Sequence, residues 1–263
     1  MIAIEVNRAI DHESLCIQYA QLHQKALSEK VSDPSKVSTN NQDWFENPLV
    51  YLITARSTIT GQLIGGVRIH VFNNPNLLPL EKAIGAEDPR IHDLIKNHEK
   101  EGGVGELCAL WNRQKGLMIT DKLTTAALAF CQQLPISKLL CFPGQHMFDF
   151  LTTFGFQTEL SVGANGEFNY PSPQYLSRIV SLNPKNLTLT SSDRKSEILK
   201  LRENPITSMT YHSKGQFLTY DYKLWGSEPR NNQNGIQSAI RTSSNHNPLD
   251  PLSQGKINII KES

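Results

Sequence analysis

The chain has 263 residues, 38% of them hydrophobic, and a formal net charge of +1 at pH 7. That length allows one large or two small domains with a substantial core, and the near-zero charge gives no reason to expect a nucleic-acid partner or an acidic membrane surface. No stretch approaches the roughly 20 apolar residues of a membrane span, and the first residues lack the apolar run of a signal peptide. These exclusions predict a cytoplasmic protein without a transmembrane segment.

Residues 1–10 predict an opening strand, and a helix capped by Asp11 or Ser14 is expected to run to about Glu29. One face of that helix carries apolar residues at helical spacing, namely Leu15, Tyr19, Leu22 and Ala26. The pattern predicts an amphipathic helix with one apolar face.

Residues 30–48 are polar and rich in breakers, which predicts a long loop whose aromatic pair Trp44-Phe45 pins it to the core. Residues 49–57 and 62–72 are expected to form a β-hairpin around a Thr-Gly turn. Arg68 lies on the second strand. If its side chain points inward, it needs an anionic partner such as a substrate carboxylate or phosphate, because an unpaired buried charge is costly; a surface position is the alternative.

Residues 73–88 contain a short apolar helical segment, and residues 89–98 predict a helix with proline in its first turn. His92 and His98 of this second helix are expected to be solvated. The four cysteines lack any CxxC spacing and lie among apolar residues: Cys16, Cys108, Cys131 and Cys141. Buried free thiols in a reducing cytoplasm are expected, with neither a disulfide framework nor a metal site.

The stretch from Gly105 to Phe156 predicts an alternation of strands and helices around which the rest of the chain is organised. The expected elements are a strand at 106–111, a turn at 112–116, a helix from 117 that ends at Pro135, a strand at 138–142, a helix at 145–153 and a strand that begins at Phe156.

The loop between the first strand and the first helix of this stretch is a candidate phosphate or pyrophosphate site. A helix that follows such a loop presents unpaired N–H groups and the positive end of its dipole. Arg113 and Lys115 add positive charge beside Gly116. An ordinary βα turn with solvated side chains is the alternative.

The C-terminal part predicts strands that flank a turn at 164–166, a helix at 192–203 and a second hairpin at 206–211 and 216–224. Tyr220 and Tyr222 share one face of the last strand. From residue 226 the chain is polar and rich in Asn, Ser, Gln and Pro. We therefore expect a domain over residues 1–225 and a disordered or loosely attached tail over residues 226–263.

Two motifs in the central stretch resemble the GNAT acyltransferase superfamily. Residues 113–118 (RQKGLM) are similar to the loop that binds the pyrophosphate of coenzyme A, with Arg113 and Gly116 at matching positions and Met118 where a small residue is usual. Residues 150–156 (FLTTFGF) match the family's aromatic-x-x-x-aromatic-Gly-Phe pattern, with Leu151 where many relatives carry the Tyr that protonates the departing thiolate.

Upstream residues resemble one branch of that superfamily, the acyl-homoserine lactone (autoinducer) synthases and long-chain N-acyl amino acid synthases. Arg68 lies in a Gly-x-x-Arg-hydrophobic strand, and Glu106 begins a segment similar to the branch's Glu-hydrophobic-Ser-Arg-Phe. Ala109 stands where the branch has its Arg. Within this branch the region that corresponds to residues 30–48 folds over the acyl donor and acceptor.

The resemblance implies an α/β (α+β) GNAT-like acyl-CoA N-acyltransferase fold, with a mixed, mostly antiparallel central sheet flanked by helices. It implies an enzyme that moves an acyl group from acyl-CoA or acyl carrier protein to an amine, amino-acid-like small-molecule acceptor, without a metal. Glu106 would be the base and Arg68 a second catalytic residue. The donor-binding residues would be Ala109, Leu110, Trp111, Arg113, Lys115, Gly116, Leu117 and Met118.

Other readings stay open at this stage. A catalytically silent GNAT-like module could bind an acyl donor or a partner protein, or an unrelated α/β domain could bind a phosphorylated ligand at residues 113–116. Cys108 is a conceivable nucleophile, but no histidine is placed in sequence as its partner, and a packed thiol is the competing interpretation. His146 is a further candidate base or acid.

Overall fold

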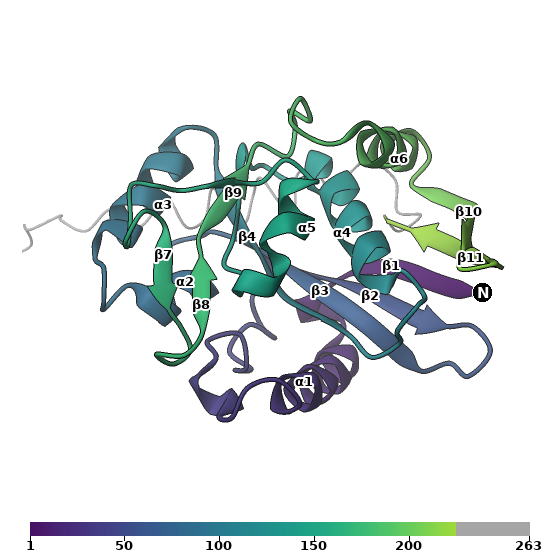
Figure 1. Ribbon diagram of the computed structural model, residues 1–263, viewed down its shortest axis with the longest axis horizontal. Helices are drawn as coiled ribbons and strands as arrows, with labels where there is room; N and C mark the ends of the chain where they lie inside the picture. Colours follow the sequence, from purple (N-terminus) through teal and green to yellow (C-terminus); the bar gives the residue numbers. More distant parts are fainter. Residues whose placement is uncertain (225–263) are drawn as a thin grey trace, which may run out of the picture. The chain divides into compact units, whose positions relative to one another are not determined.

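The computed structural model describes residues 1–224, and these form a nine-stranded sheet, a two-stranded sheet and helices on both faces of the larger sheet (Figure 1). The large sheet has the order β10-β11-β1-β2-β3-β4-β5-β9-β6. Its strands are β1 (Ile2–Arg8), β2 (Val50–Ser57), β3 (Leu63–Val71), β4 (Val104–Asn112), β5 (Lys138–Cys141), β6 (Gln157–Thr158), β9 (Val180–Leu182), β10 (Ile206–Ser213) and β11 (Gln216–Lys223). The pairs β1–β11 and β4–β5 are parallel and the other pairs are antiparallel, so the expected mixed, mostly antiparallel sheet is confirmed.

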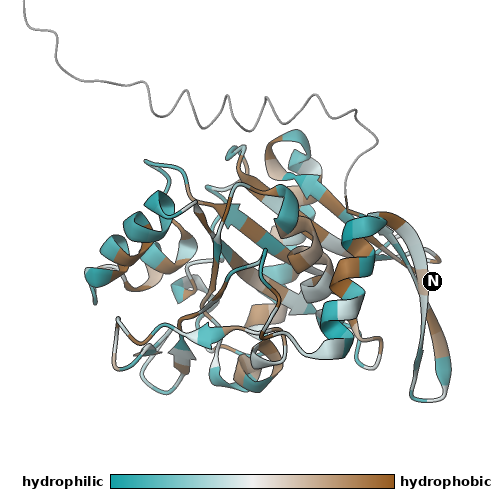
Figure 2. Ribbon diagram, turned by 90° about the horizontal axis from the view of Figure 1, so that it is seen from above, coloured by the Kyte–Doolittle hydropathy of each residue, from teal (hydrophilic) through white to brown (hydrophobic). Residues whose placement is uncertain are grey.

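Helices cover the two faces of this sheet unequally. The α-helices are α1 (Glu13–Ser28), α2 (Pro79–Ile84), α3 (Arg90–Lys100), α4 (Ile119–Phe130), α5 (Phe148–Thr152) and α6 (Ser192–Glu203). Helix α1 lies below the sheet in Figure 1, whereas α4, α5 and α6 lie above it. In Figure 2 the central strands and the inward parts of the helices that cover them are hydrophobic, as buried elements should be.

Two adjacent glycines let helices approach β3 closely from opposite sides. A Cβ on Gly65 would lie 2.5 Å from a side-chain carbon of Ile119 in α4, and a Cβ on Gly66 would lie 2.5 Å from the ring of Tyr19 in α1. Any larger residue at either position would push a helix off the sheet. The Gly-Gly step therefore fixes α1 and α4 directly over the middle of the sheet.

A β-bulge interrupts β4 where it passes the middle of β3. Gly66 pairs with Trp111 and Arg68 with Cys108, so two β4 residues, Ala109 and Leu110, face the single residue Val67. Ala109 takes a left-handed φ of 52°, which is uncommon for a residue other than glycine. Because the bulge shifts the side-chain alternation, Trp111 joins Ala109 in the cluster under α1, while Leu110 packs against the core under α4.

Most predicted elements are present, with helix 192–203 found at Ser192–Glu203 and the second hairpin at β10 and β11. Two expectations are wrong in detail. Helix α1 begins after His12 without a side-chain cap, and of its expected apolar face Tyr19 and Ala26 are buried while Leu15 and Leu22 are only partly buried; Cys16 and His23 complete the buried set. The side chain of His98 is only 13% exposed and contacts Glu101. Strands flank the 164–166 turn as expected: β6 precedes it, and the pair β7 (Glu167–Asn169) and β8 (Leu176–Arg178) follows it, before β9 inside the large sheet.

The four cysteines are free; Cys16, Cys108 and Cys131 are buried as expected, whereas Cys141 is only partly buried. None of the described helices is long and apolar enough to cross a membrane. The predicted tail over residues 226–263 lies outside the described residues, so its boundary remains a prediction.

Candidate active site

Four polar side chains from two neighbouring strands lie on the face of the sheet that α1 covers. Arg68 and His70 are two residues apart on β3, and they pair across the strands with Cys108 and Glu106 of β4. All four are buried. Residues at i and i+2 of a strand point to the same face, so the cross-strand register brings these groups into one cluster, which we call the β3–β4 polar cluster.

Arg68 is the largest buried side chain of this cluster and is 1% exposed. Its guanidinium stacks on the ring of Trp44, with 4.2 Å from Cζ to the ring centroid, and an Nη2 hydrogen donates to the carbonyl oxygen of Thr39 over 2.8 Å. Its Nε has no hydrogen-bond partner. Arg68 therefore points inward, as a substrate-binding arginine must. The neutral Thr39 carbonyl stands where an anion would bind, and the Nε–H donor has no acceptor.

Glu106 is 2% exposed and accepts a hydrogen bond from the backbone N–H of Leu80 over 2.9 Å. Burial raises the pKa of this carboxyl to about 8, against the lowering effects of the Leu80 N–H and the Arg68 charge; the nearby Glu81 raises it further. Such a carboxyl is mostly protonated at neutral pH. At slightly higher pH it ionises, and its high proton affinity then suits a general base.

The other two members of the cluster are poorly suited to lead the chemistry. Burial raises the pKa of the Cys108 thiol to about 12, so a thiolate nucleophile is disfavoured there, and Cys108 acts as packing. Burial and the Arg68 charge lower the pKa of His70 well below its usual value, so His70 is neutral, and its Nε2 has no hydrogen-bond partner.

The segment over residues 30–48 closes the β3–β4 polar cluster from outside. Besides the contact of Thr39 and Trp44 with Arg68, two tyrosines hold the first half of the segment. The Tyr170 hydroxyl donates to the Lys36 carbonyl oxygen over 3.0 Å, and the Tyr175 hydroxyl donates to the Lys30 carbonyl oxygen over 3.1 Å. Trp44 thus pins the loop to the core, as expected, by way of the candidate site.

Strand β4 runs past the end of its neighbour β5 on the side of the bulge. Their parallel pairing ends at Leu107 and Cys141, whereas β4 continues to Asn112. The predicted donor-binding residues Ala109, Leu110 and Trp111 lie on this part of β4, which has β3 on one side and no β5 partner on the other. The Tyr19 hydroxyl of α1 donates to the Ala109 carbonyl oxygen over 2.5 Å, which supports the bulge from the α1 side.

The loop over residues 113–118 leads from this part of β4 into α4. Gly116 and Met118 both take left-handed φ values, 84° and 54°, and Met118 provides no side-chain cap for the helix. The first N–H groups of α4 therefore lack an intrahelical or capping partner, as an anion site requires. A Cβ on Gly116 would meet nothing within 4 Å, so the loop has open space at that point.

The charged groups of this loop are placed at the surface. Lys115 is exposed, and Arg113 is exposed with an Nη2 atom 3.4 Å from a carboxylate oxygen of Glu29. The hydroxyl of Tyr220 in β11 donates to the carbonyl oxygen of Leu117 and fixes the end of the loop. The predicted donor-binding residues are thus consecutive along one path from the bulge to α4.

Two other sequence candidates lie outside the β3–β4 polar cluster. His146 is exposed in a short turn after β5, and partial desolvation there lowers its pKa. Leu151 of α5 is 2% exposed and belongs to the core under α4. Its buried aliphatic side chain cannot donate a proton, so this position supplies no acid.

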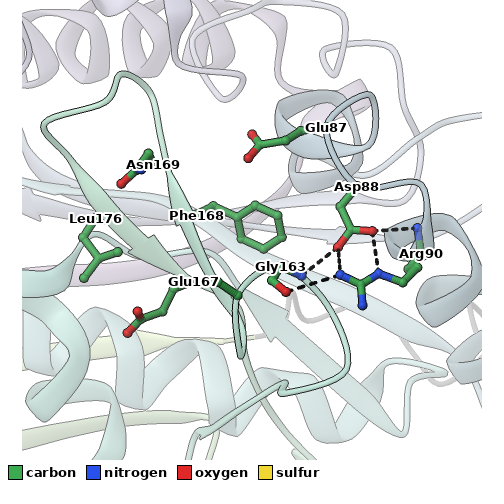
Figure 3. Close-up of a pocket in the computed structure, with 9 residues that line it drawn as sticks. Glu87, Asp88, Arg90, Gly163, Glu167, Phe168, Asn169 and Leu176 are labelled. Carbon is green, nitrogen blue, oxygen red and sulfur yellow. Dashed lines mark hydrogen bonds and ion pairs between the residues drawn. The ribbon is translucent and has the colours of Figure 1, made fainter.

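A surface depression of about 470 Å³ lies between the start of α3 and the β7–β8 hairpin (Figure 3). Asp88 there accepts hydrogen bonds from the Arg90 guanidinium and the Gly163 N–H, which lowers the pKa of its carboxyl to about 2. These contacts tie the α2–α3 turn to residue 163. None of the predicted site residues lines this depression, and we assign it a structural role.

Several residues of the candidate site escape sequence reasoning. Helical spacing marks Tyr19 only as an apolar position, yet it supports the bulge and its ring lies 5.8 Å from the Arg68 guanidinium carbon. Glu81 acts electrostatically on Glu106 and is itself in contact with His92, and neither residue was singled out for the site. A glutamate in the first turn of an apolar helix is the available sign for Glu81, because such a carboxylate, once buried, must find hydrogen-bond donors.

Several solved structures are similar to this protein in fold. The N-acyl amino acid synthase FeeM from uncultured soil microbes matches with a TM-score of 0.53 and 14% identity, over 74% of this chain and 98% of its own. BjaI, a CoA-dependent acyl-homoserine lactone synthase solved with SAM and isopentyl-CoA, matches with a TM-score of 0.51 and 11% identity, over 93% and 99%. TofI, solved in a ternary complex with an inhibitor and MTA, matches at 0.50 and 14%, over 74% and 96%. The chain has their fold. No family model and no curated protein sequence matches it.

This likeness confirms the expected GNAT-like fold and the resemblance to the synthase branch at the level of the fold. At 11–14% identity it says nothing about individual residues. The roles of Glu106, Arg68 and residues 109–118 therefore rest on the geometry described above.

Proposed function

We propose that this protein is an N-acyltransferase that moves an acyl group from a thioester, acyl-CoA or acyl carrier protein, to the amine of an amino-acid-like acceptor. One observation carries the proposal. The part of β4 that leaves β5 is flanked at one end by a buried carboxyl of high proton affinity, Glu106, and at the other by the uncapped start of α4. These are the groups that a thioester donor and an amine acceptor need at opposite ends of one strand.

The donor is proposed to lie along the unpaired edge of β4. Its pyrophosphate meets the N–H groups at the start of α4 and the charges of Arg113 and Lys115. Its pantetheine amides bond to the backbone that the bulge and the end of β5 leave without a neighbouring strand. The thioester carbonyl then lies near residues 109–111, where a backbone N–H polarises its oxygen.

The acceptor is proposed to bind at the β3–β4 polar cluster. A carboxylate of the acceptor replaces the Thr39 carbonyl on Arg68 and uses the free Nε, which gives the two-pronged contact that arginine makes with carboxylates. The segment over residues 30–48 has to move for this exchange, because its Thr39 and Trp44 contact the guanidinium of the buried Arg68.

The reaction forms one C–N bond and breaks one C–S bond. Glu106, once ionised, takes a proton from the acceptor ammonium, and the amine attacks the thioester carbon. The C–S bonding pair leaves with the thiolate. The second proton lost by the attacking nitrogen passes through water to this thiolate and gives the free thiol, since Leu151 supplies no acid. Because the pKa of Glu106 is about 8, we expect kcat/KM to rise with pH and level off above about 8.

The test measures donor binding and turnover separately. Calorimetry with acetyl-, octanoyl- and palmitoyl-CoA reports donor affinity, and release of the free CoA thiol with a panel of amino acids reports transfer. Glu106→Gln should keep donor affinity and lower turnover by roughly 10²- to 10⁴-fold, the usual contribution of a general base. Exposed Glu203→Gln at the end of α6 is the matched control and should leave both quantities unchanged. Equal turnover of the Glu106→Gln variant and the wild-type protein at saturation would remove Glu106 from the mechanism.

A catalytically silent module that binds an acyl donor is the second candidate. The buried Leu151 and the alanine at position 109 favour it, because both stand where the resembled enzymes carry functional side chains. Donor binding without thiol release for every acceptor, with acyl carrier protein tested as an alternative donor carrier, would select this candidate.

A further inference from the structure

A general base that is 2% exposed must pass its proton to solvent before the next turnover. Charged and titratable groups face Glu106 from several elements. They are Arg68 and His70 of β3, Cys108 of β4, Cys141 of β5, Glu81 and Lys82 of α2, and Tyr170 after β7. The route depends on which of these groups can take up a proton.

All but one of these groups are unsuitable. Arg68 and Lys82 are cations. Burial raises the pKa of Cys108, Cys141 and Tyr170, so these groups already hold their protons, and the depressed pKa of His70 makes it a poor acceptor. Among these described neighbours, Glu81 is the one further carboxyl group.

Glu81 and Glu106 are held at the same turn of the chain. The Leu80 N–H donates to Glu106 Oε2 over 2.9 Å, and the Leu78 N–H, two residues earlier, donates to Glu81 Oε2 over 2.8 Å. Both carboxyl groups are thus fixed by the amides that begin α2, and each is almost fully buried. Their mutual repulsion is one cause of the high pKa of Glu106.

Glu81 is connected to the surface by His92 of α3. Glu81 Oε1 lies 2.9 Å from His92 Nδ1, and the exposed fraction of the side chain rises from 3% at Glu81 to 35% at His92. Gly85 leaves room for this ring, because a Cβ there would lie 2.7 Å from His92 Nε2. The imidazole of His92 therefore packs against Gly85, its Nδ1 contacts the buried Glu81 carboxylate, and part of the ring is open to water.

From this arrangement we infer that Glu81 and His92 form the proton outlet of Glu106, an inference that rests on the proposed acyl transfer. In each turnover the Glu81–His92 pair gains one proton from Glu106 and loses one to water from the exposed imidazole ring, so its own protonation is restored. Both residues act through Glu106 without touching the substrate.

The first experiment uses chemical rescue of the full chain. His92→Ala should lower kcat by about 10- to 100-fold without changing the donor KM, and it should increase the solvent deuterium isotope effect on kcat, because proton release becomes slow. Added imidazole should restore kcat in proportion to its concentration. His98→Ala on the same helix, whose ring contacts Glu101 instead, is the matched control and should show neither loss nor rescue.

A second experiment needs no activity. If the two carboxyls are linked, Glu81→Gln removes a neighbouring negative charge and moves the pH at which Glu106 ionises downward. That pH is measured from the pH dependence of the stability difference between proteins with and without the Glu106→Gln change. An unshifted profile overturns the outlet, as does a His92→Ala loss that imidazole leaves unrestored. Absence of turnover in the wild-type protein with every donor and acceptor would instead reject the proposed function, and the outlet with it.

Discussion

Glu106 shows how burial can prepare a carboxyl group for acid–base chemistry while making the folded protein less stable. The folded state keeps its proton up to about pH 8, whereas an unfolded glutamate releases it near pH 4.5. Between these values the folded state binds more protons than the unfolded state, so the unfolding free energy falls as pH rises. Residues placed for function commonly carry this kind of cost.

We therefore predict that Glu106→Gln stabilises the protein at high pH. Near pH 4 the two proteins should unfold with similar free energies. The variant should gain stability progressively up to about pH 8, by on the order of 3–5 kcal/mol at most, which is the difference between the two pKa values converted to free energy. Urea unfolding at about pH 4.5, 6.5 and 8.5, chosen to span the two pKa values, measures it. A pH-independent difference would show that Glu106 ionises normally in the folded protein.

At the scale of elements, the N-terminus of α4 can attract an anion, and the acidic side chain in its first turn is held by neighbouring cations. Its first turn contains Asp121, a negative charge that would oppose a bound phosphate, but Arg194 and Lys122 pair with this carboxylate. The dipole and the N–H groups of α4 therefore remain available to an anion at the 113–118 loop.

Reversing the charge of this loop should weaken donor binding. Arg113→Glu places a carboxylate beside the uncapped helix start and beside Glu29. We expect a loss of about 1–3 kcal/mol in CoA binding, since charge-assisted hydrogen bonds are removed. The melting temperature should hardly change, because Arg113 is exposed. Calorimetry checks the affinity, with exposed Lys185→Glu as the control; equal losses for the two variants would mean that only overall charge matters.

A buried ion pair joins the helical layer to the last hairpin. The Lys122 ammonium of α4 is 2.7 Å from a carboxylate oxygen of Glu197 in α6 and 3.7 Å from the ring centroid of Tyr211 in β10. The Tyr211 hydroxyl donates to the same Glu197 carboxylate over 2.5 Å and lies 3.2 Å from the Tyr222 hydroxyl of β11. Helices α4 and α6 and the β10–β11 hairpin therefore meet at one network of hydrogen bonds and charge contacts.

Removing one partner of this network should be costly. Lys122→Ala leaves Glu197 without its cation in a site where both side chains are largely buried. We expect a loss of about 3–5 kcal/mol of unfolding free energy, as for other broken buried pairs. Chemical denaturation of the variant measures the loss, and exposed Lys200→Ala on α6 provides the control. A change below about 1 kcal/mol, the range of an exposed pair, would contradict a structural role for the pair.

For the whole molecule, the sequence was sufficient for the long elements and insufficient for their irregularities. Periodicity and breakers located α6 and the β10–β11 hairpin, because long amphipathic segments with clear stops have strong local signals. Strands β8 and β9, three residues each, have too few positions for a period. The bulge at Ala109 has no glycine to mark it, since the strain is supported by the distant Tyr19.

The candidate site was predictable only in part, for the same reason. Arg68 and Glu106 were each singled out by resemblance. That they lie close together depends on the pairing register of β3 and β4, two strands distant in sequence. Lys122 lies in a helix whose pattern is otherwise apolar, and its burial depends on Glu197, which lies 75 residues further along. Pairings of this kind are decided by tertiary packing, which no local pattern encodes.

The final prediction concerns the extent of the folding unit. Strand β11 lies between β10 and β1, and its register runs to Lys223; the N–H of the following Leu224 donates to the Pro205 carbonyl oxygen over 2.9 Å, and Leu224 is 1% exposed. The hairpin is therefore complete within the described residues. The chain beyond residue 225 is polar and rich in Asn, Ser and Pro, a composition poor in the apolar groups that a core needs.

We expect a chain truncated after Trp225 to keep its melting temperature within a few degrees, with an unchanged far-UV circular dichroism spectrum per folded residue. Truncation after Leu218 is the matched control. It removes Tyr220 and Tyr222 together with the β1–β11 pairing, and should leave the protein unfolded or insoluble. Insolubility of the longer product as well would show that residues 226–263 contribute to the core or to a second subunit, and would extend the domain beyond its predicted boundary.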